Sequence, residues 1–175
     1  MNQPFKMDKS TKDKGVYESA LLTRNISIPM YLVGGNIIEI LSQKISNMFD
    51  GKCIVEGFVR PGSINIVTHS SGVISGDHVS FEIVFQCQLC YVVEGMLLNC
   101  VAKNITKAGI RAESTDESPS PFIIFIARDH HFMNEYFSSI KENDTFMAKV
   151  IGQRFELNDK YISIIGELKN PKLKK

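Results

Sequence analysis

The sequence lacks a strong excess of either charge. Its 175 residues include 20 Lys and Arg against 19 Asp and Glu, for a formal net charge of +1 at pH 7. This balance excludes the globally basic type of nucleic-acid binder. The charge is unevenly placed, however, because residues 1–15 hold four lysines and two aspartates, and residues 169–175 hold four lysines and no acid. We interpret these ends as a flexible basic arm and a basic tail on a mildly acidic body.

Long apolar runs are also missing. No run approaches the roughly 20 residues that a helix needs to cross a bilayer. The first 15 residues are too polar to form the apolar segment of a signal peptide. With 43% hydrophobic residues, the chain can nevertheless bury a sizeable core. These features predict a folded, soluble, intracellular protein with no membrane partner.

Motifs for catalysis or cofactor binding are absent. The sequence has no Walker loop, GxGxxG, HExxH or EF-hand spacing. Cys87 and Cys90 form a single CxxC, but residues three apart on a strand point to opposite faces and cannot hold one ion without a bulge. Asp129, His130 and His131 lack the spacing of a nucleophile, a base and an orienting group. We therefore expect that the protein is not an enzyme and that it has no cofactor, metal or small-molecule substrate. We also expect the cysteines to be reduced and the histidines to lie on a loop.

The first half of the chain is predicted to form a sheet and one helix. β-Branched and aromatic residues at 16–33 indicate a strand that ends before two glycines. Apolar residues at helical spacing follow over 37–48, with Asn36 and Glu39 placed to form a capping box. Two further strands are predicted, at 52–59 and 78–92.

The strand predicted at 78–92 has an unusually regular alternation. One face is apolar and consists of Val79, Phe81, Ile83, Phe85, Cys87, Leu89 and Tyr91. The other face is polar except for Val84 and consists of His78, Ser80, Glu82, Gln86, Gln88 and Cys90. This pattern predicts one long strand with a wet face. We expect a partner to cover that face.

The second half predicts a five-stranded OB barrel with a helix between its third and fourth strands. The strands are expected at 96–105, 109–114, 122–128, 145–155 and 161–168, and the helix at 134–140. A boundary at Gly95 gives an α+β chain with domains at 16–94 and 95–168.

Six basic residues lie on or beside the predicted barrel strands: Lys103, Lys107, Arg111, Arg128, Lys149 and Arg154. OB folds use such strands, with aromatic side chains between them, as a groove for single-stranded nucleic acid. The alternative is a scatter of solvated charges, because ten acids accompany eight bases between residues 96 and 168. An RNA groove therefore requires local clustering of bases.

Several segments, by their order and near-equal spacing, resemble a known family. They are GGNIIEILSQKISNMFDGKC, GFV, SSGVI, FEIVFQCQLCYVVEGMLLNCVAKNITKAGIRAES, FIARDH and VIGQRFELNDKYISIIGEL. Together they are similar to the seventh subunit of eukaryotic RNA polymerase II and to its archaeal counterpart. The segments VEGFVRPGSINIVTHSSGV and FIARDHH most resemble the versions carried by nucleocytoplasmic large DNA viruses, especially mimivirus-like ones.

The resemblance implies an N-terminal truncated RNP-like domain of sheet and helix, followed by an OB barrel of the ribosomal protein S-one type. It implies a non-catalytic stalk subunit of a DNA-directed RNA polymerase. Its partners would be the largest and other core subunits, a subunit-four-like protein and nascent single-stranded RNA. A viral version would work in the host cytoplasm, in the viral factory, and in the virion; a cellular one would work in the nucleus. A free-standing RNA-binding module, such as a translation factor, is the alternative.

Two sets of candidate site residues follow. The loop that docks on the polymerase core maps onto Ile64, Asn65, Ile66, Val67, Thr68, His69, Ser70, Ser71 and Gly72. The expected RNA contacts are Lys103, Lys107, Arg111, Phe122, Phe125, Arg128, His130, His131, Lys149 and Arg154. Ile110 stands where S-one barrels have an aromatic residue, and we expect Phe122 or Phe125 to replace it in part. Three acids in the loop at 113–121 repel phosphate, so we expect weak RNA binding.

Overall fold

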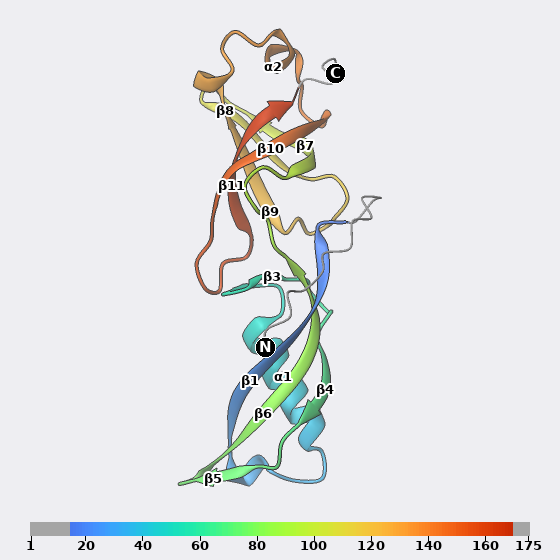
Figure 1. The fold of residues 1–175 in the computed structure, drawn as a ribbon, viewed down its shortest axis with the longest axis vertical. Helices are drawn as coiled ribbons and strands as arrows, with labels where there is room; N and C mark the ends of the chain where they lie inside the picture. The colour runs from blue at the N-terminus through green and yellow to red at the C-terminus, as the bar shows by residue number, and fades with distance from the viewer. Residues whose placement is uncertain (1–14, 170–175) are drawn as a thin grey trace, which may run out of the picture.

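A computed structural model describes residues 15–169, so the expected basic arm and tail lie outside the described residues except for Gly15 and Lys169. The molecule is elongated, with two units stacked along its long axis (Figure 1). One unit holds the first six strands and the longer helix, and the other is a barrel. Over residues 15–169, no helix is long and apolar enough to cross a bilayer.

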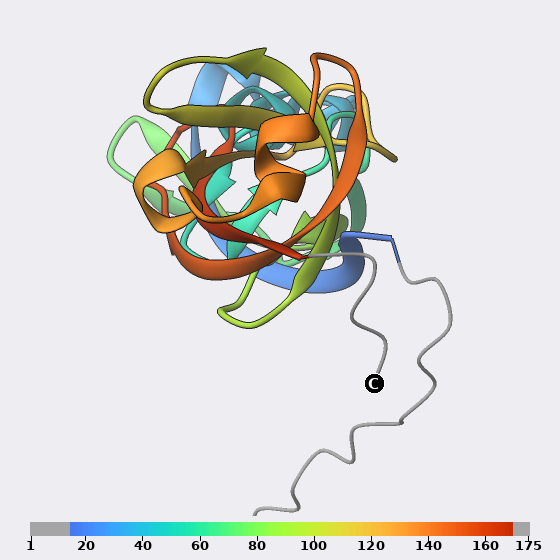
Figure 2. The same ribbon diagram turned by 90° about the horizontal axis from the view of Figure 1, so that it is seen from above.

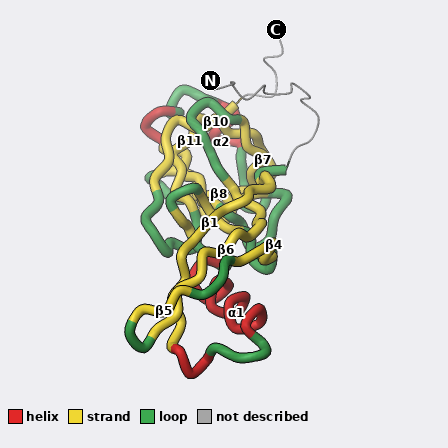
Figure 3. The backbone as a smooth tube through the Cα atoms, turned by 60° about the horizontal axis from the view of Figure 1, so that its bottom comes forward, coloured by secondary structure: helices red, strands yellow, loops and turns green. Residues whose placement is uncertain are grey.

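The first unit is an antiparallel sheet packed against one helix. Its elements are β1 (Tyr17–Pro29), the 3-10 helix η1 (Met30–Leu32), α1 (Ile37–Phe49), β2 (Cys53–Ile54), β3 (Gly57–Val59), β4 (Asn65–His69), β5 (Val73–Ser75) and β6 (His78–Cys90). The strand order is β1-β6-β3-β2, and β4 and β5 also pair with β6. Figure 3 shows η1 and β5 at the end of this unit that lies away from the barrel.

The alternation predicted for β6 is confirmed except at its barrel end. The apolar residues from Val79 to Leu89 are buried and form one core with Leu41 and Ile45 of α1. Cys90, expected on the wet face, is fully buried, and Tyr91, expected on the apolar face, is 56% exposed. The prediction was wrong for these two residues because Cys90 packs into the barrel core, which the sequence pattern of a single sheet does not include.

Two further local expectations were wrong. The Asn36 side chain makes no capping bond, so there is no capping box with Glu39, and the Ile40 N–H donates to the Asn36 carbonyl instead. The strand predicted at 52–59 is divided into β2 and β3. Gly57 explains the division, since its φ of +141° is one that side-chain-bearing residues rarely adopt. A Cβ at Gly57 would also come within 2.5 Å of the Cys90 carbonyl oxygen.

The segment expected to be a docking loop is largely a strand. Residues 65–69 form β4, which pairs with β6 and has a register shift between Ile66 and Thr68. The turn that follows is held against β6, because the Ser70 N–H donates to the Glu82 carbonyl and the Ser70 Oγ accepts the Glu82 N–H. The irregular register explains why the sequence alternation did not reveal this strand.

The second unit is a closed five-stranded barrel. Its elements are β7 (Leu97–Ile105), β8 (Gly109–Ser114), β9 (Phe122–Ala127), the 3-10 helix η2 (Arg128–His130), α2 (Glu135–Ser139), β10 (Thr145–Arg154) and β11 (Ile162–Lys169). The order β10-β11-β9-β8-β7 closes by the pairing of β7 with β10, and β9 runs parallel to β11. The five predicted strands and the helix are confirmed, and this order is consistent with an OB-type barrel. Figure 2 looks down on the barrel end that carries α2.

The two units share buried side chains. The barrel core contains Phe122, Ile124 and Ile162, and it extends to Phe58 and Cys90 of the first unit. Two backbone hydrogen bonds add to this contact: the Cys53 N–H donates to the Asp159 carbonyl at 2.7 Å, and the Asn158 N–H donates to the Cys53 carbonyl at 2.9 Å. Packing and hydrogen bonds therefore join the units at the β10–β11 turn.

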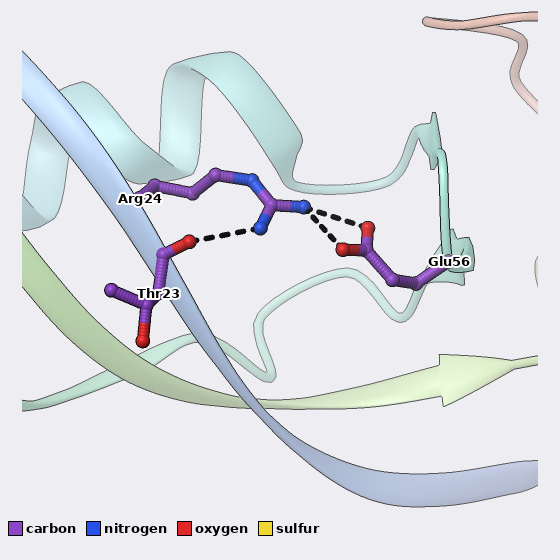
Figure 4. A network of polar contacts seen from close by, with 3 residues as sticks. All are labelled: Thr23, Arg24 and Glu56. Carbon is purple, nitrogen blue, oxygen red and sulfur yellow. Dashed lines mark hydrogen bonds and ion pairs between the residues drawn. The ribbon is translucent and has the colours of Figure 1, made fainter.

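An ion pair joins the two edges of the first sheet. One guanidinium nitrogen of Arg24, on β1, lies 2.7 Å from both carboxylate oxygens of Glu56 in the β2–β3 turn, and another donates to the Thr23 carbonyl (Figure 4). The guanidinium also lies 5.9 Å from the centroid of the Phe49 ring. Because β1 and β2 stand at opposite ends of the strand order, this ion pair links the two sides of the sheet.

Candidate nucleic-acid interface

A groove of about 500 Å³ lies between the barrel wall and the β8–β9 loop. Alternation along each strand places one set of side chains in the barrel core and the other on the wall. The wall of the groove includes Lys103 of β7, Arg111 of β8 and Ile123 of β9. Lys160 and Tyr161, from the end of the β10–β11 turn, complete the lining opposite the loop.

Two of the six predicted bases, Lys103 and Arg111, meet in this groove. Arg111 pairs in register with Phe125 of β9, whose partly buried ring reaches over Gly109 on the outer wall. A basic residue beside an aromatic ring is the combination that single-stranded nucleic-acid sites use for the phosphate and the base.

Three acids line the same groove. The Arg111 Nη2 lies 3.8 Å from Glu113 Oε1, and the Arg60 Nη2 of the first unit lies 3.0 Å from Glu117 Oε2. Asp116 is the third. These acids partly offset the positive charge of the bases in the groove.

The other predicted bases lie outside this groove. Arg128 donates through Nε to the Lys107 carbonyl and through Nη2 to the Thr106 carbonyl, so it fixes the β7–β8 loop. Arg154 is exposed on β10, and its Nη2 lies 2.8 Å from Glu156 Oε1. Lys149, also on β10, is paired in register with Leu97 and Glu167.

Two of the expected RNA contacts are buried. His131 is only 6% exposed: its Nδ1 lies 2.8 Å from the Ala127 carbonyl, and its Nε2 accepts the Leu168 N–H at 3.0 Å. These partners require a neutral ring with its proton on Nδ1. Phe122 is fully buried in the barrel core, as is Ile110, the residue that stands where S-one barrels have an aromatic one. Neither His131 nor Phe122 is therefore available to RNA in this structure, whereas His130 is exposed.

Sequence reasoning missed Lys160 and Tyr161. Both are exposed and line the groove. The signal was present, because Tyr161 precedes the buried Ile162 and so belongs to the outward set of the last strand. Phe132 and Met133, before α2, were also missed, although they are among the most exposed apolar residues of the described chain.

The four cysteines are buried and free. Cys87 and Cys90 lie in separate cores, in agreement with the prediction that they cannot hold one ion. Burial raises the pKa of the Cys90 and Cys100 thiols to about 12. Among the residues that the structure describes, no three His, Cys, Asp or Glu side chains are grouped to hold a metal.

Exposed apolar residues also occur at the end of the first unit that lies away from the barrel. Six exposed apolar residues of η1, the η1–α1 connection, α1 and β5 lie at this end, and we call them the distal apolar surface: Met30, Tyr31, Leu32, Val33, Ile38 and Ile74. Val73 is exposed too, but it points to the opposite face of β5 from Ile74. The Met30 N–H donates to the Asp77 carbonyl at 2.8 Å, which ties η1 to the β5–β6 turn. Exposed apolar patches of this kind mark interaction sites.

No protein-family model matches the sequence, and no curated protein matches it significantly. The groove and the distal apolar surface are therefore the features on which a function can be based.

Proposed function

We propose that this chain is a non-catalytic stalk subunit of a multisubunit DNA-directed RNA polymerase. The first unit would correspond to a truncated RNP-like domain that docks on the largest and other core subunits. The second would correspond to an OB barrel of the ribosomal protein S-one type that contacts nascent single-stranded RNA. The sequence resemblance suggests a nucleocytoplasmic large DNA virus as the source, and hence work in the host cytoplasm and virion.

The observation that carries the proposal is the separation of two chemically different surfaces along an elongated molecule. The distal apolar surface lies at the end of the first unit away from the barrel, whereas the groove with Lys103 and Arg111 lies on the barrel, beside the contact between the two units. A stalk requires this separation, since it must bind the polymerase at one place and the transcript at another.

The proposed docking site is the distal apolar surface, extended by the neighbouring strand β4. Val67 is the most exposed apolar residue of the segment first expected to dock, at 55%. Tyr31 and Ile74 are more exposed, at 85% and 68%. Burying apolar side chains stabilises a complex by about 25 cal/mol per Å² of area removed from water.

The barrel would bind RNA weakly alone and more effectively on the polymerase. Arg111 has Glu113 nearby, and Asp116 and Glu117 line the same groove, which limits the attraction of phosphate. Attachment to the polymerase raises the effective concentration of the transcript at the groove, so weak contacts suffice. We assign the polar face of β6, with Glu82 and Gln86 exposed, to a subunit-four-like partner.

A free-standing RNA-binding module is the second candidate, favoured by the closed barrel with its groove. Such a module would use the barrel alone. It leaves the distal apolar surface without a partner, which is why we favour the stalk.

Affinity purification of the tagged full chain from cells that produce it, followed by mass spectrometry, tests the proposal. Wild type should recover the large polymerase subunits. Ile74→Glu should lose them, because it places a charge in the docking surface. Leu157→Glu, at an equally exposed apolar residue of the β10–β11 turn, is the control and should retain them. Polymerase recovery by Ile74→Glu would refute docking at this surface, and ribosomal components in place of polymerase would favour the free-standing module.

A further inference from the structure

The acidic loop of the groove is tied to the first unit through Arg60. The Arg60 Nη2 donates to Glu117 Oε2 at 3.0 Å, and the Arg60 guanidinium lies 5.0 Å from the centroid of the Tyr17 ring. The backbone of Arg60 is fixed as well, since its N–H donates to the Gln88 carbonyl on β6 at 2.8 Å. One arginine therefore links the start of β1, the central strand β6 and the β8–β9 loop.

Arg60 does not line the groove, but its partner does. Glu117 lines the groove with Lys103 and Arg111, and its side chain is only 19% exposed. A carboxylate in this position repels a phosphate chain along the same wall. The guanidinium offsets that charge and restrains the carboxylate on the side of the first unit.

The rest of the loop is held by its own serines. The Ser120 Oγ accepts the Ser114 N–H at 2.9 Å and donates to the Phe122 carbonyl, and the Ser114 Oγ accepts the Asp116 N–H. These bonds fix both ends of the loop on the barrel. Among the described residues, the ion pairs of the loop include only one to the first unit, that of Glu117 with Arg60.

We propose that Arg60 is a positioning residue that sets the RNA affinity of the groove by controlling Glu117. This inference rests on the proposed RNA-binding function and adds a means of regulation to it. Because Tyr17 and Arg60 belong to the first unit, a partner that displaces either of them releases Glu117 into the groove. Binding to the first unit then changes RNA affinity in the barrel, and the reverse follows by linkage.

A simpler effect of Arg60 must be distinguished from this one. As a cation near the groove, Arg60 attracts phosphate directly, whatever residue stands at 117. A double-mutant cycle separates the two effects, because control through Glu117 disappears when Glu117 is neutral and direct attraction does not. If the Glu117 carboxylate is released to about 7–10 Å from a phosphate in a largely aqueous groove, its unit charge changes the affinity for RNA about twofold to fivefold.

The experiment measures binding of the full chain to a fluorescein-labelled single-stranded RNA of about 12 nucleotides by anisotropy, at low salt. The variants are Arg60→Gln, Glu117→Gln and the double variant. We expect Arg60→Gln to weaken binding about twofold to fivefold. The double variant should bind as tightly as Glu117→Gln. An equal loss from Arg60→Gln in both backgrounds, or no loss in either, would overturn the inference.

Two controls keep this result separate from the proposed function. Arg24→Gln removes an arginine from the ion pair with Glu56, away from the groove, and should leave RNA affinity unchanged. Lys103→Gln combined with Arg111→Gln tests the groove itself. Unchanged affinity in that variant would place RNA elsewhere and overturn both the groove and the role of Arg60. Loss of affinity there, with an Arg60 effect that is independent of Glu117, would overturn only the inference.

Discussion

Replacing Gly57 by alanine should strongly destabilise the protein where its two units meet. The added Cβ would lie 2.5 Å from the Cys90 carbonyl oxygen and 3.3 Å from its carbon, and both are backbone atoms of β6. The φ of +141° adds backbone strain of about 1–3 kcal/mol for an L residue. Since β6 is held by four strands, relief of the contact must shift β3 itself. We expect Gly57→Ala to lower the free energy of unfolding by about 3–5 kcal/mol in total, which is within the range for core overpacking combined with backbone strain.

Gly62→Ala is the matched control for this effect. Gly62 also has a positive φ, +71°, but a Cβ there meets nothing within 4 Å. Gly62→Ala should lower the free energy of unfolding by about 1–2 kcal/mol, because only the backbone conformation is unfavourable there. Urea unfolding followed by far-UV circular dichroism measures both free energies of unfolding. Equal losses for the two variants would refute the reasoning, because the contact with Cys90 would then contribute nothing.

Three further predictions concern the groove, the thiols and the barrel core. Lys103→Gln and Arg111→Gln should each reduce the slope of log affinity for single-stranded RNA against log salt by about 0.7; an unchanged slope would mean that they contact no phosphate. Burial raises the pKa of Cys90 and Cys100 from 9.0 to about 12, so the unfolded chain loses these protons first. Stability in urea should therefore be full below pH 9 and fall as pH rises towards 12, and a constant value would contradict burial of the thiols. Phe122→Ala should cost about 3–5 kcal/mol of unfolding free energy, whereas Phe125→Ala, on the outer wall, should cost clearly less and weaken RNA binding.

The barrel could be predicted from the sequence because its strands alternate regularly and are separated by clear turns. Ile162 and Ile164 face inward while Ser163 and Ile165 face outward, as a period of two requires. The same rule was sufficient to place β6. It failed at Cys90 because a second core, assembled from distant residues such as Phe122, buries a position that one sheet alone would leave wet.

The candidate site was less predictable, since it depends on which turns meet. Lys103 and Arg111 come together because β7 and β8 are neighbours, which the predicted topology already required. Tyr161 and Arg60 reach the region only through the closure of the barrel and the contact between the units. β4 was missed because its register shift at Ile66 to Thr68 breaks the alternation on which strand prediction depends.

The position of β6 in the chain also determines the order in which the first unit can fold. β6 is the last strand of that unit, and β1, β3, β4 and β5 all pair with it, with Tyr17 opposite Cys90. During synthesis, only the short β2–β3 pairing can form before β6 leaves the ribosome. The apolar residues of β1 and α1 must therefore remain without their sheet until the chain is made past Cys90. This sequence-distant pairing predicts slow folding of the first unit and a nascent chain that needs protection from aggregation.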